Sequence, residues 1–247
     1  MKQLKILSTL GIACILLFSS CGGGEEKTTD TTLTTDSTAT TDNATTATTE
    51  STINTTPENI MVVRHKVANF AKWKPSYDEH DSMRLANGIH SFVIGRGVED
   101  SNMVMVAVKA DDIAKAKAFA KDPGLKAAMK KGGVTGTPLI SFNTIVYQDM
   151  SANIPDLRSM TTFTVKDWDA WKKAFESNRQ LRIDNGVTDR AYGHDVDDNH
   201  KVTLVVAIND TAKANAFWNS DLIKQKRAEA GVVGEVKRFE YNVVQKY

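Results

Sequence analysis

Short apolar runs and helix-spaced aromatic residues alternate along this chain and predict its secondary structure. Residues 60–67 form an apolar, β-branched run that is typical of a strand. Phe70, Trp73 and Tyr77 follow at the spacing of one helix face. Asn69 precedes them and is a suitable N-cap, because its side chain can accept a hydrogen bond from the first helical turn. The segment therefore predicts a strand followed by an amphipathic helix.

The next elements extend this pattern to a complete unit. Residues 91–96 and 103–108 read as two strands, and the second of these is apolar enough to be central in a sheet. An alanine-rich segment after Asp112 predicts a second helix, and residues 139–147 a last strand. Pro75 lacks an N–H group, so we expect the first regular turn of the first helix to begin near it.

The whole unit occurs twice at a constant offset, since Trp171 lies 98 positions after Trp73 (171 − 73 = 98). Without gaps from Met61 to Asp149, 22 of 89 aligned positions are identical. The second copy is expected in residues 158–247 and the first in residues 60–150. The pairs that carry the match include Tyr77 with Phe175, Arg84 with Arg182, and Asn87-Gly88 with Asn185-Gly186.

Each copy has the order strand, helix, strand, strand, helix, strand, which is the ferredoxin-like split unit. Helices cover one face of such a sheet, so the other face must pack against something. A second copy in the same chain supplies that partner. We therefore predict an α+β fold in which two tandem ferredoxin-like (βαββαβ) units form a pseudo-dimeric α/β barrel, with a monomeric folded part.

The sequence resembles the dimeric α/β-barrel superfamily. The resemblance is carried by His65-Lys66-Val67, Phe70, Trp73, Asn87-Gly88 and the segment DPGLKAAMKKGGV that ends at Val134. That superfamily includes antibiotic-biosynthesis-type monooxygenases, haem-degrading monooxygenases and cyclase-like proteins. The resemblance implies a cofactor-independent monooxygenase or cyclase-like enzyme as one candidate. The haem-degrading members use an Asn, a Trp and an iron-binding His on the first helix, and this set cannot be matched in full, so no cofactor is expected.

The N-terminus resembles a bacterial lipoprotein signal. Lys2 and Lys5 precede the apolar residues 6–18, and small residues lead to Cys21. The resemblance implies that residues 1–20 are removed and that Cys21 carries lipid; an ordinary secretory signal is the alternative. Glu25-Glu26-Lys27 resembles the surface-export signal of Bacteroidota lipoproteins.

Residues 21–59 are rich in threonine and almost free of apolar side chains, so they predict a disordered tether. These features predict a lipid-anchored protein of the cell envelope, at the outer membrane, facing the periplasm or the surface. The formal net charge of +1 gives no support for nucleic-acid binding. With Cys14 in the removed segment, Cys21 would be the one cysteine left, which excludes a disulfide within the mature chain.

Candidate chemistry centres on polar residues that the copies do not share. His65 alternates with Val63 and Val67, and Phe163 is its equivalent. A lone imidazole beside a cavity suits proton transfer, although a buried histidine can also be a core residue. One face of the first helix, here called the stripe, includes Trp73, His80 and Arg84 and becomes polar towards its C-terminal end. We expect this polar end to emerge at the barrel rim rather than to line a pocket. The candidate catalytic residues are His65 and His80, and the candidate ligand-binding residues are Arg64, Trp73, Arg84, His90, Arg96, Tyr192 and His194.

Three functions remain open at this level. The first is binding of a small apolar or aromatic molecule between sheet and helices, with any active pocket in residues 61–149. The second is the cofactor-independent monooxygenase or cyclase-like enzyme. The third is a structural envelope protein with a packed barrel. No metal-binding motif, nucleophile elbow or phosphate-binding loop occurs in the sequence.

Overall fold

The computed structural model describes residues 52–247; the predicted lipoprotein signal, Cys21 and most of the predicted tether lie outside this range. The first described strand is β1 (Ile53–Asn54), which pairs with Gln148 and Asp149. Pairing at residue 53 corrects the predicted end of the tether at residue 59. The backbone bonds to the end of the first repeat hold this segment against the sheet.

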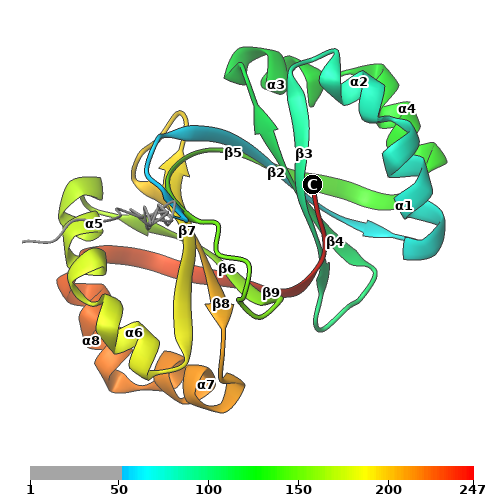
Figure 1. Ribbon diagram of the computed structural model, residues 1–247. Coiled ribbons are helices and arrows are strands. Elements are labelled where there is room, and N and C mark those ends of the chain that lie inside the picture. The colour runs from blue at the N-terminus through cyan, green and yellow to red at the C-terminus, as the bar shows by residue number, and fades with distance from the viewer. Residues whose placement is uncertain (1–51) are drawn as a thin grey trace, which may run out of the picture. The chain divides into compact units, whose positions relative to one another are not determined.

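The first repeat contains four long strands and four helices among the described residues (Figure 1). The predicted second helix is divided in two, because Asp122 caps a new helix that has Pro123 at its first position. The elements are β2 (Glu58–Val67), α1 (Phe70–Glu79), α2 (Asp81–Leu85), β3 (Ile89–Gly97), β4 (Met103–Ala110), α3 (Ile113–Phe119), α4 (Pro123–Lys131) and β5 (Val134–Asp149).

The second repeat has the same elements in the same order. The 98-residue offset is kept in the strand register: Ile60 pairs with Lys109, and Arg158 pairs with Ala207. The elements are β6 (Leu157–Val165), α5 (Trp168–Ser177), α6 (Arg179–Asp184), β7 (Val187–Asp195), β8 (Lys201–Ile208), α7 (Thr211–Asn219), α8 (Asp221–Glu229) and β9 (Val232–Lys246).

The strands of residues 52–247 form one antiparallel sheet in the order β1-β5-β2-β4-β3-β9-β6-β8-β7. A further pairing of β5 with β7 closes the sheet. The first half of β5 pairs with β2 of its own repeat, and its last residues pair with β7 of the other. Strand β9 pairs with β6 and then with β3 in the same way. The predicted pseudo-dimeric α/β barrel of two ferredoxin-like units is therefore confirmed.

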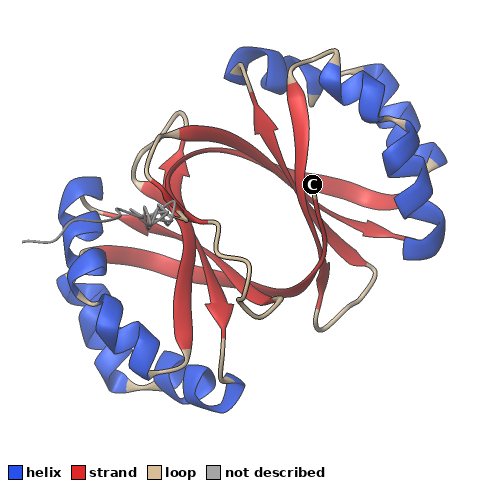
Figure 2. Ribbon diagram, viewed as in Figure 1, coloured by secondary structure: helices blue, strands red, loops and turns tan. Residues whose placement is uncertain are grey.

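Helices cover the outside of the barrel at both repeats (Figure 2). Alternate residues of β2 therefore serve two cores. Met61, Val63 and Val67 pack with Trp73 beneath the helices, whereas Ile60 and Val62 face the barrel lumen, where Met160 and Tyr241 of the second repeat meet them. Gly95 lies under the Tyr241 ring, and a Cβ there would come within 2.2 Å of a ring carbon, so only glycine fits.

Helix α1 begins at Phe70, which corrects the expectation that Pro75 starts the regular helix. Asn69 caps it, since its side chain accepts a hydrogen bond from the Lys72 N–H group. The Trp73 N–H group also donates to the Asn69 carbonyl at 3.0 Å, so a full turn forms before the proline. Burial of Trp73 in the core offsets the one backbone hydrogen bond that Pro75 cannot donate.

Candidate functional site

The first candidate site is a pocket between helices and sheet in the first repeat. Its volume is about 70 Å³. His65 and Trp73 line it together with His80 and Arg84, so the structure brings four of the predicted site residues to one place. The polar end of the α1–α2 stripe thus lines a pocket, which corrects the expectation that it emerges at the barrel rim. Arg84 is buried because α2 turns it back under Tyr77.

His65 is buried in this pocket, with 4% of its surface exposed. Its ring lies 5.5 Å from the Trp73 ring, centre to centre. Neither ring nitrogen has a hydrogen-bond partner among residues 52–247. Burial lowers the pKa of His65 to about 4, because water no longer stabilises the charged form. The imidazole is therefore neutral at pH 7 and keeps a free acceptor and a free donor.

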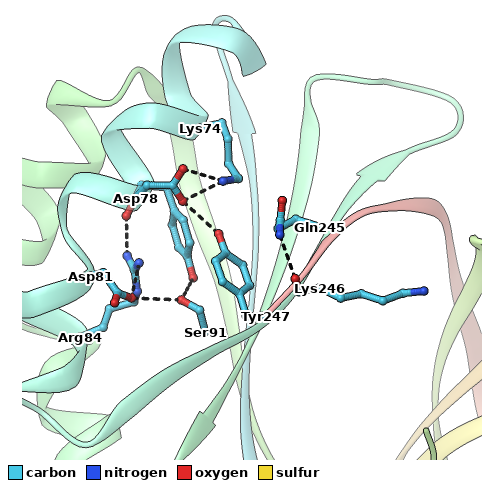
Figure 3. A network of polar contacts seen from close by, with 9 residues as sticks. Lys74, Asp78, Asp81, Arg84, Ser91, Gln245, Lys246 and Tyr247 are labelled. Atoms are coloured by element: carbon cyan, nitrogen blue, oxygen red, sulfur yellow. Dashed lines mark hydrogen bonds and ion pairs between the residues drawn. The ribbon is translucent and has the colours of Figure 1, made fainter. Parts of the chain in front are cut away.

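His80 and Arg84 are held by backbone oxygens. The Nδ1 atom of His80 lies 2.6 Å from the Ser76 carbonyl oxygen. Since a carbonyl only accepts, Nδ1 carries the proton, and Nε2 is an acceptor while the ring is neutral. Arg84 donates to the Tyr77 carbonyl at 2.7 Å and to Asp81 at 2.9 Å (Figure 3). These bonds fix the side chains at the pocket wall.

The equivalent pocket of the second repeat has a volume of about 110 Å³. Phe163 and Asn178 stand where the first repeat has His65 and His80, so it lacks a titratable base at those positions. Arg182 is kept, and Asp189 neutralises it with two hydrogen bonds of 2.7 and 2.6 Å. Neither helix–sheet pocket fits a porphyrin by size, and Phe163 and Asn178 provide no histidine ligand.

The other predicted site residues of the first repeat lie away from this pocket. Arg64 faces the opposite side of β2, with its guanidinium 4.9 Å from the centre of the Phe239 ring. Arg96 stacks on Phe70 and donates to the Ser101 carbonyl. His90 is exposed and lies 3.0 Å from an Asp111 carboxylate oxygen.

Two further candidates, in the second repeat, are occupied by local contacts. Tyr192 donates a hydrogen bond of 2.6 Å to Glu176 and stacks on Tyr147. Nδ1 of His194 lies 2.9 Å from the Asp195 carbonyl, and its ring meets the Trp168 ring edge-on. Neither residue lines a pocket with His65 or His80.

The barrel lumen contains a larger cavity, of about 340 Å³. Both repeats line it, and most of the lining side chains are apolar. The polar ones include Arg158, Arg190, Asp149 and Tyr241. No metal site accompanies them, since residues 52–247 contain no group of three or more His, Cys, Asp and Glu side chains that could hold an ion.

Arg158 is the unusual group in the lumen. It is 3% exposed, and its one hydrogen bond within the described part of the chain is to the Leu157 carbonyl at 3.3 Å. Arg190 lies 3.5 Å from Asp149 and donates to the Ser151 carbonyl. Burial raises the pKa of the Asp149 carboxyl, but hydrogen bonds from Ser151 and the positive charges of Arg190 and Arg179 outweigh it, so the pKa is lowered overall. Asp149 is therefore ionised at neutral pH.

Solved structures share this architecture. An anthrone oxidase-like protein is similar with a TM-score of 0.55 and 13% identity, over 79% of this chain and 95% of its own. A protein from Fusobacterium nucleatum, provisionally named a monooxygenase, has a TM-score of 0.51 and 12% identity. The match covers 76% of this chain and 93% of that protein. A protein provisionally named a chlorite dismutase has a TM-score of 0.51 and 13% identity. The match covers 77% of this chain and 96% of that protein.

The fold is ferredoxin-like α+β in all of them. Each repeat is less than half of the chain, so matches of this length include both repeats. At these identities the likeness concerns the fold alone. In sequence, no family description matches this chain and no curated protein does.

Sequence reasoning missed Arg158 and Arg190, although a signal for them exists. Ile60 and Phe92 stand at the equivalent positions of the first repeat. A charge in one copy where the other has a large apolar residue is the same kind of difference that singled out His65. None of the helices in residues 52–247 has the length and apolar character needed to cross a membrane.

Proposed function

We propose that this chain is a small-molecule-binding protein and that the barrel lumen is its ligand site. The observation that carries the proposal is the 340 Å³ cavity that both repeats line. Binding pockets for small molecules commonly measure about 300–1,000 Å³, with apolar walls and a few polar groups that fix orientation. The lumen has this composition, with Arg158 and Arg190 among apolar side chains of both repeats.

This proposal moves the ligand from the place that sequence reasoning favoured, between sheet and helices, to the inside of the barrel. The helix–sheet pockets of about 70 and 110 Å³ are smaller than the usual range for ligand sites. A cavity of the lumen's size also argues against a solidly packed structural barrel. Protein interiors otherwise contain few voids larger than a water molecule.

An uncharged fluorescent probe, N-phenyl-1-naphthylamine, tests the lumen without presuming a charged ligand. We expect its emission to rise on binding to the wild-type protein. Ala107→Leu and Ala191→Leu, which fill the cavity from either repeat, should abolish this rise. Ala127→Leu, on the exposed face of α4, is the matched control and should bind as the wild type does. Undiminished binding in both lumen variants would contradict the proposal.

A second candidate is a cofactor-independent oxygenase that uses the pocket at His65. A neutral imidazole with two free nitrogens favours it, because such a group can accept a proton from an acidic C–H or O–H group. The substrate would supply the electrons: a CH₂ group and O₂ give a carbonyl group and one water. Met83 and Met129 line the pocket, and these adaptable side chains would have to move to admit a ring.

Oxygen uptake with anthrone as test substrate examines this candidate. Wild-type protein should consume oxygen, and His65→Phe, which copies the second repeat, should not. The uncatalysed oxidation of anthrone in buffer is the reference. Uptake by the wild type that matches this reference, or equal uptake by both proteins, would rule out the role of His65.

Lipid anchoring belongs to the same proposal. The order of charged, apolar and small residues before Cys21 supports lipid attachment there, which would join the barrel to a membrane of the cell envelope. The outer membrane is the favoured location. A tether between lipid and barrel would let the lumen sample solutes near the membrane surface.

A further inference from the structure

The two repeats present different chemistry to the lumen at equivalent positions. Strand register places Arg158 opposite Ala207 as it places Ile60 opposite Lys109, so Arg158 is the counterpart of Ile60. Arg190 is likewise the counterpart of Phe92, and Thr203 of Met105. All six residues line the cavity. The second repeat is therefore the cationic side of the lumen and the first repeat the apolar side.

The guanidinium of Arg158 forms no close ion pair within the described residues, although Asp156 and Asp149 attract it from beyond 4 Å. It has five N–H donors, of which one makes a bond of 3.3 Å to a backbone carbonyl. No carboxylate of residues 52–247 lies within 4 Å of it, although the residue is 3% exposed. A buried charge without a partner is strongly destabilising. An anion inside the cavity would remove that cost, which points to a ligand rather than to a structural role.

The surrounding charges limit the anion to a single negative charge. Among the charged residues that line the cavity, Arg190 lies 3.5 Å from Asp149 and offsets it, so Arg158 leaves one net positive charge there. Lys246, at the cavity edge, is already paired with Asp156 at 3.2 Å. Asp149 would repel a dianion such as a phosphate monoester. Tyr241 also lines the cavity, and its hydroxyl can donate to a carboxylate.

We propose that the lumen binds an amphipathic monocarboxylate, an organic acid with an apolar chain or ring. This ligand assignment rests on the proposed function, since it names the class of molecule that the lumen site would bind. The carboxylate lies at Arg158, with Arg190 and Tyr241 as further donors, and the apolar part lies along Ile60, Phe92 and Met105. Met150 and Tyr247 line the cavity and are 49% and 53% exposed, so they mark the entrance.

Calorimetric titration of octanoate, octan-1-ol and acetate into the protein at pH 8 tests whether the ligand is an amphipathic monocarboxylate. We expect octanoate to bind at least tenfold more tightly than either of the others, because only octanoate offers both the charge and the chain. Arg158→Met should weaken the binding of octanoate at least tenfold and leave the binding of octan-1-ol unchanged. Arg227→Met, which removes a half-buried arginine outside the lumen, is the matched control and should bind octanoate as the wild type does.

The thermal midpoint of each variant separates a ligand site from a structural role. Arg158→Met should unfold at the same or a higher temperature than the wild type, since it removes an unpaired buried charge. A fall in this midpoint together with unchanged octanoate affinity would overturn the assignment. Octan-1-ol binding as tightly as octanoate would reject the carboxylate class but keep the lumen as a site. Acetate binding as tightly as octanoate would reject the apolar chain, and absence of binding by all three would reject the proposed function itself.

Discussion

Arg182 and Asp189 form a buried, two-pronged ion pair in the second repeat, with N–O distances of 2.7 and 2.6 Å. Their counterparts in the first repeat are Arg84 and Ser91, where Arg84 turns instead to the partly exposed Asp81. The two repeats thus keep the same arginine stacked on the aromatic residue of α1 or α5 but neutralise it differently. Packing positions are shared, and charge partners are not.

Asp189→Ser, which copies the first repeat, should therefore destabilise the fold. Side-chain exposures of 9% and 4% show that the pair is out of water, so the substitution leaves a buried guanidinium uncompensated. We expect a loss of roughly 3–5 kcal/mol in the free energy of unfolding, measured by urea denaturation. The double variant Arg182→Met/Asp189→Ser should regain part of this loss. A single variant as stable as the wild type would show that the pair contributes nothing.

Trp73 and Trp171 are expected to be equivalent core anchors. They are 4% and 3% exposed, and each packs against the aromatic residues of its own helix. Trp73→Ala and Trp171→Ala should each cost roughly 3–5 kcal/mol, as large truncations in cores do. Denaturant unfolding of both variants measures this. A loss in one repeat several times that in the other would contradict the expected equality of the copies in stability.

Much of the fold is predictable because its anchors are local and occur twice. Asn69 caps α1, in agreement with the sequence pattern, and Asp167 caps α5 in the same way. Gly88 and Gly186 adopt positive φ after α2 and α6, so the predicted single first helix is divided in two in each repeat. The last strands are longer than predicted. Gly136 and Pro138 suggest a turn, yet β5 begins at Val134, because an irregularity in its pairing with β2 accommodates them.

The candidate site was less predictable, because it depends on which residues the barrel closure brings together. His65 and His80 could be selected from one strand and one helix, and they do line one pocket. Arg158 and Arg190 differ from their first-repeat counterparts already in the sequence, but their place in one shared cavity follows only from the pairing of β5 with β7 and of β9 with β3. Such long-range pairings leave no periodic signal in the sequence.

The folded part should be monomeric, because the second repeat already occupies the place of a partner subunit. A chain beginning at Thr52, which keeps β1, should scatter light as a single copy at micromolar concentration. Within residues 52–247, β5 and β9 each cross from one repeat to the other and close the sheet, so the pairing positions that a partner subunit would use are already occupied. A stable dimer under these conditions would contradict the prediction.

Cys21 should carry lipid in the cell that makes this protein. Cys21→Ser should release the protein from membranes or leave residues 1–20 attached, because the modified cysteine is both the anchor and the cleavage point in the signal that the sequence resembles. Membrane fractionation and the mass of the N-terminus measure both effects. Membrane association and cleavage that persist in Cys21→Ser would show that an ordinary secretory signal or another anchor operates.

His65 should make the stability of the fold depend on pH between about 4 and 6.5, and His65→Phe should remove this dependence. Burial lowers the pKa of His65 from its ordinary value of 6.5 to about 4. Between these values the unfolded chain binds a proton at His65 that the folded chain does not. Stability from this residue is therefore fully present above pH 6.5 and is lost as the pH falls towards 4. The loss should approach about 3 kcal/mol.

Urea denaturation of wild type and His65→Phe at pH 7, 6, 5 and 4.5 measures this effect. Carboxylates contribute equally to both proteins, so the difference between the two curves isolates His65. At pH 7 the variants should be nearly equal in stability, because Phe163 fills the equivalent place in the second repeat and packs against Trp171 there. As the pH falls, the wild type should lose stability faster than His65→Phe. Parallel curves would mean that His65 is solvated or hydrogen-bonded, and the case for a free imidazole in the helix–sheet pocket would then be withdrawn.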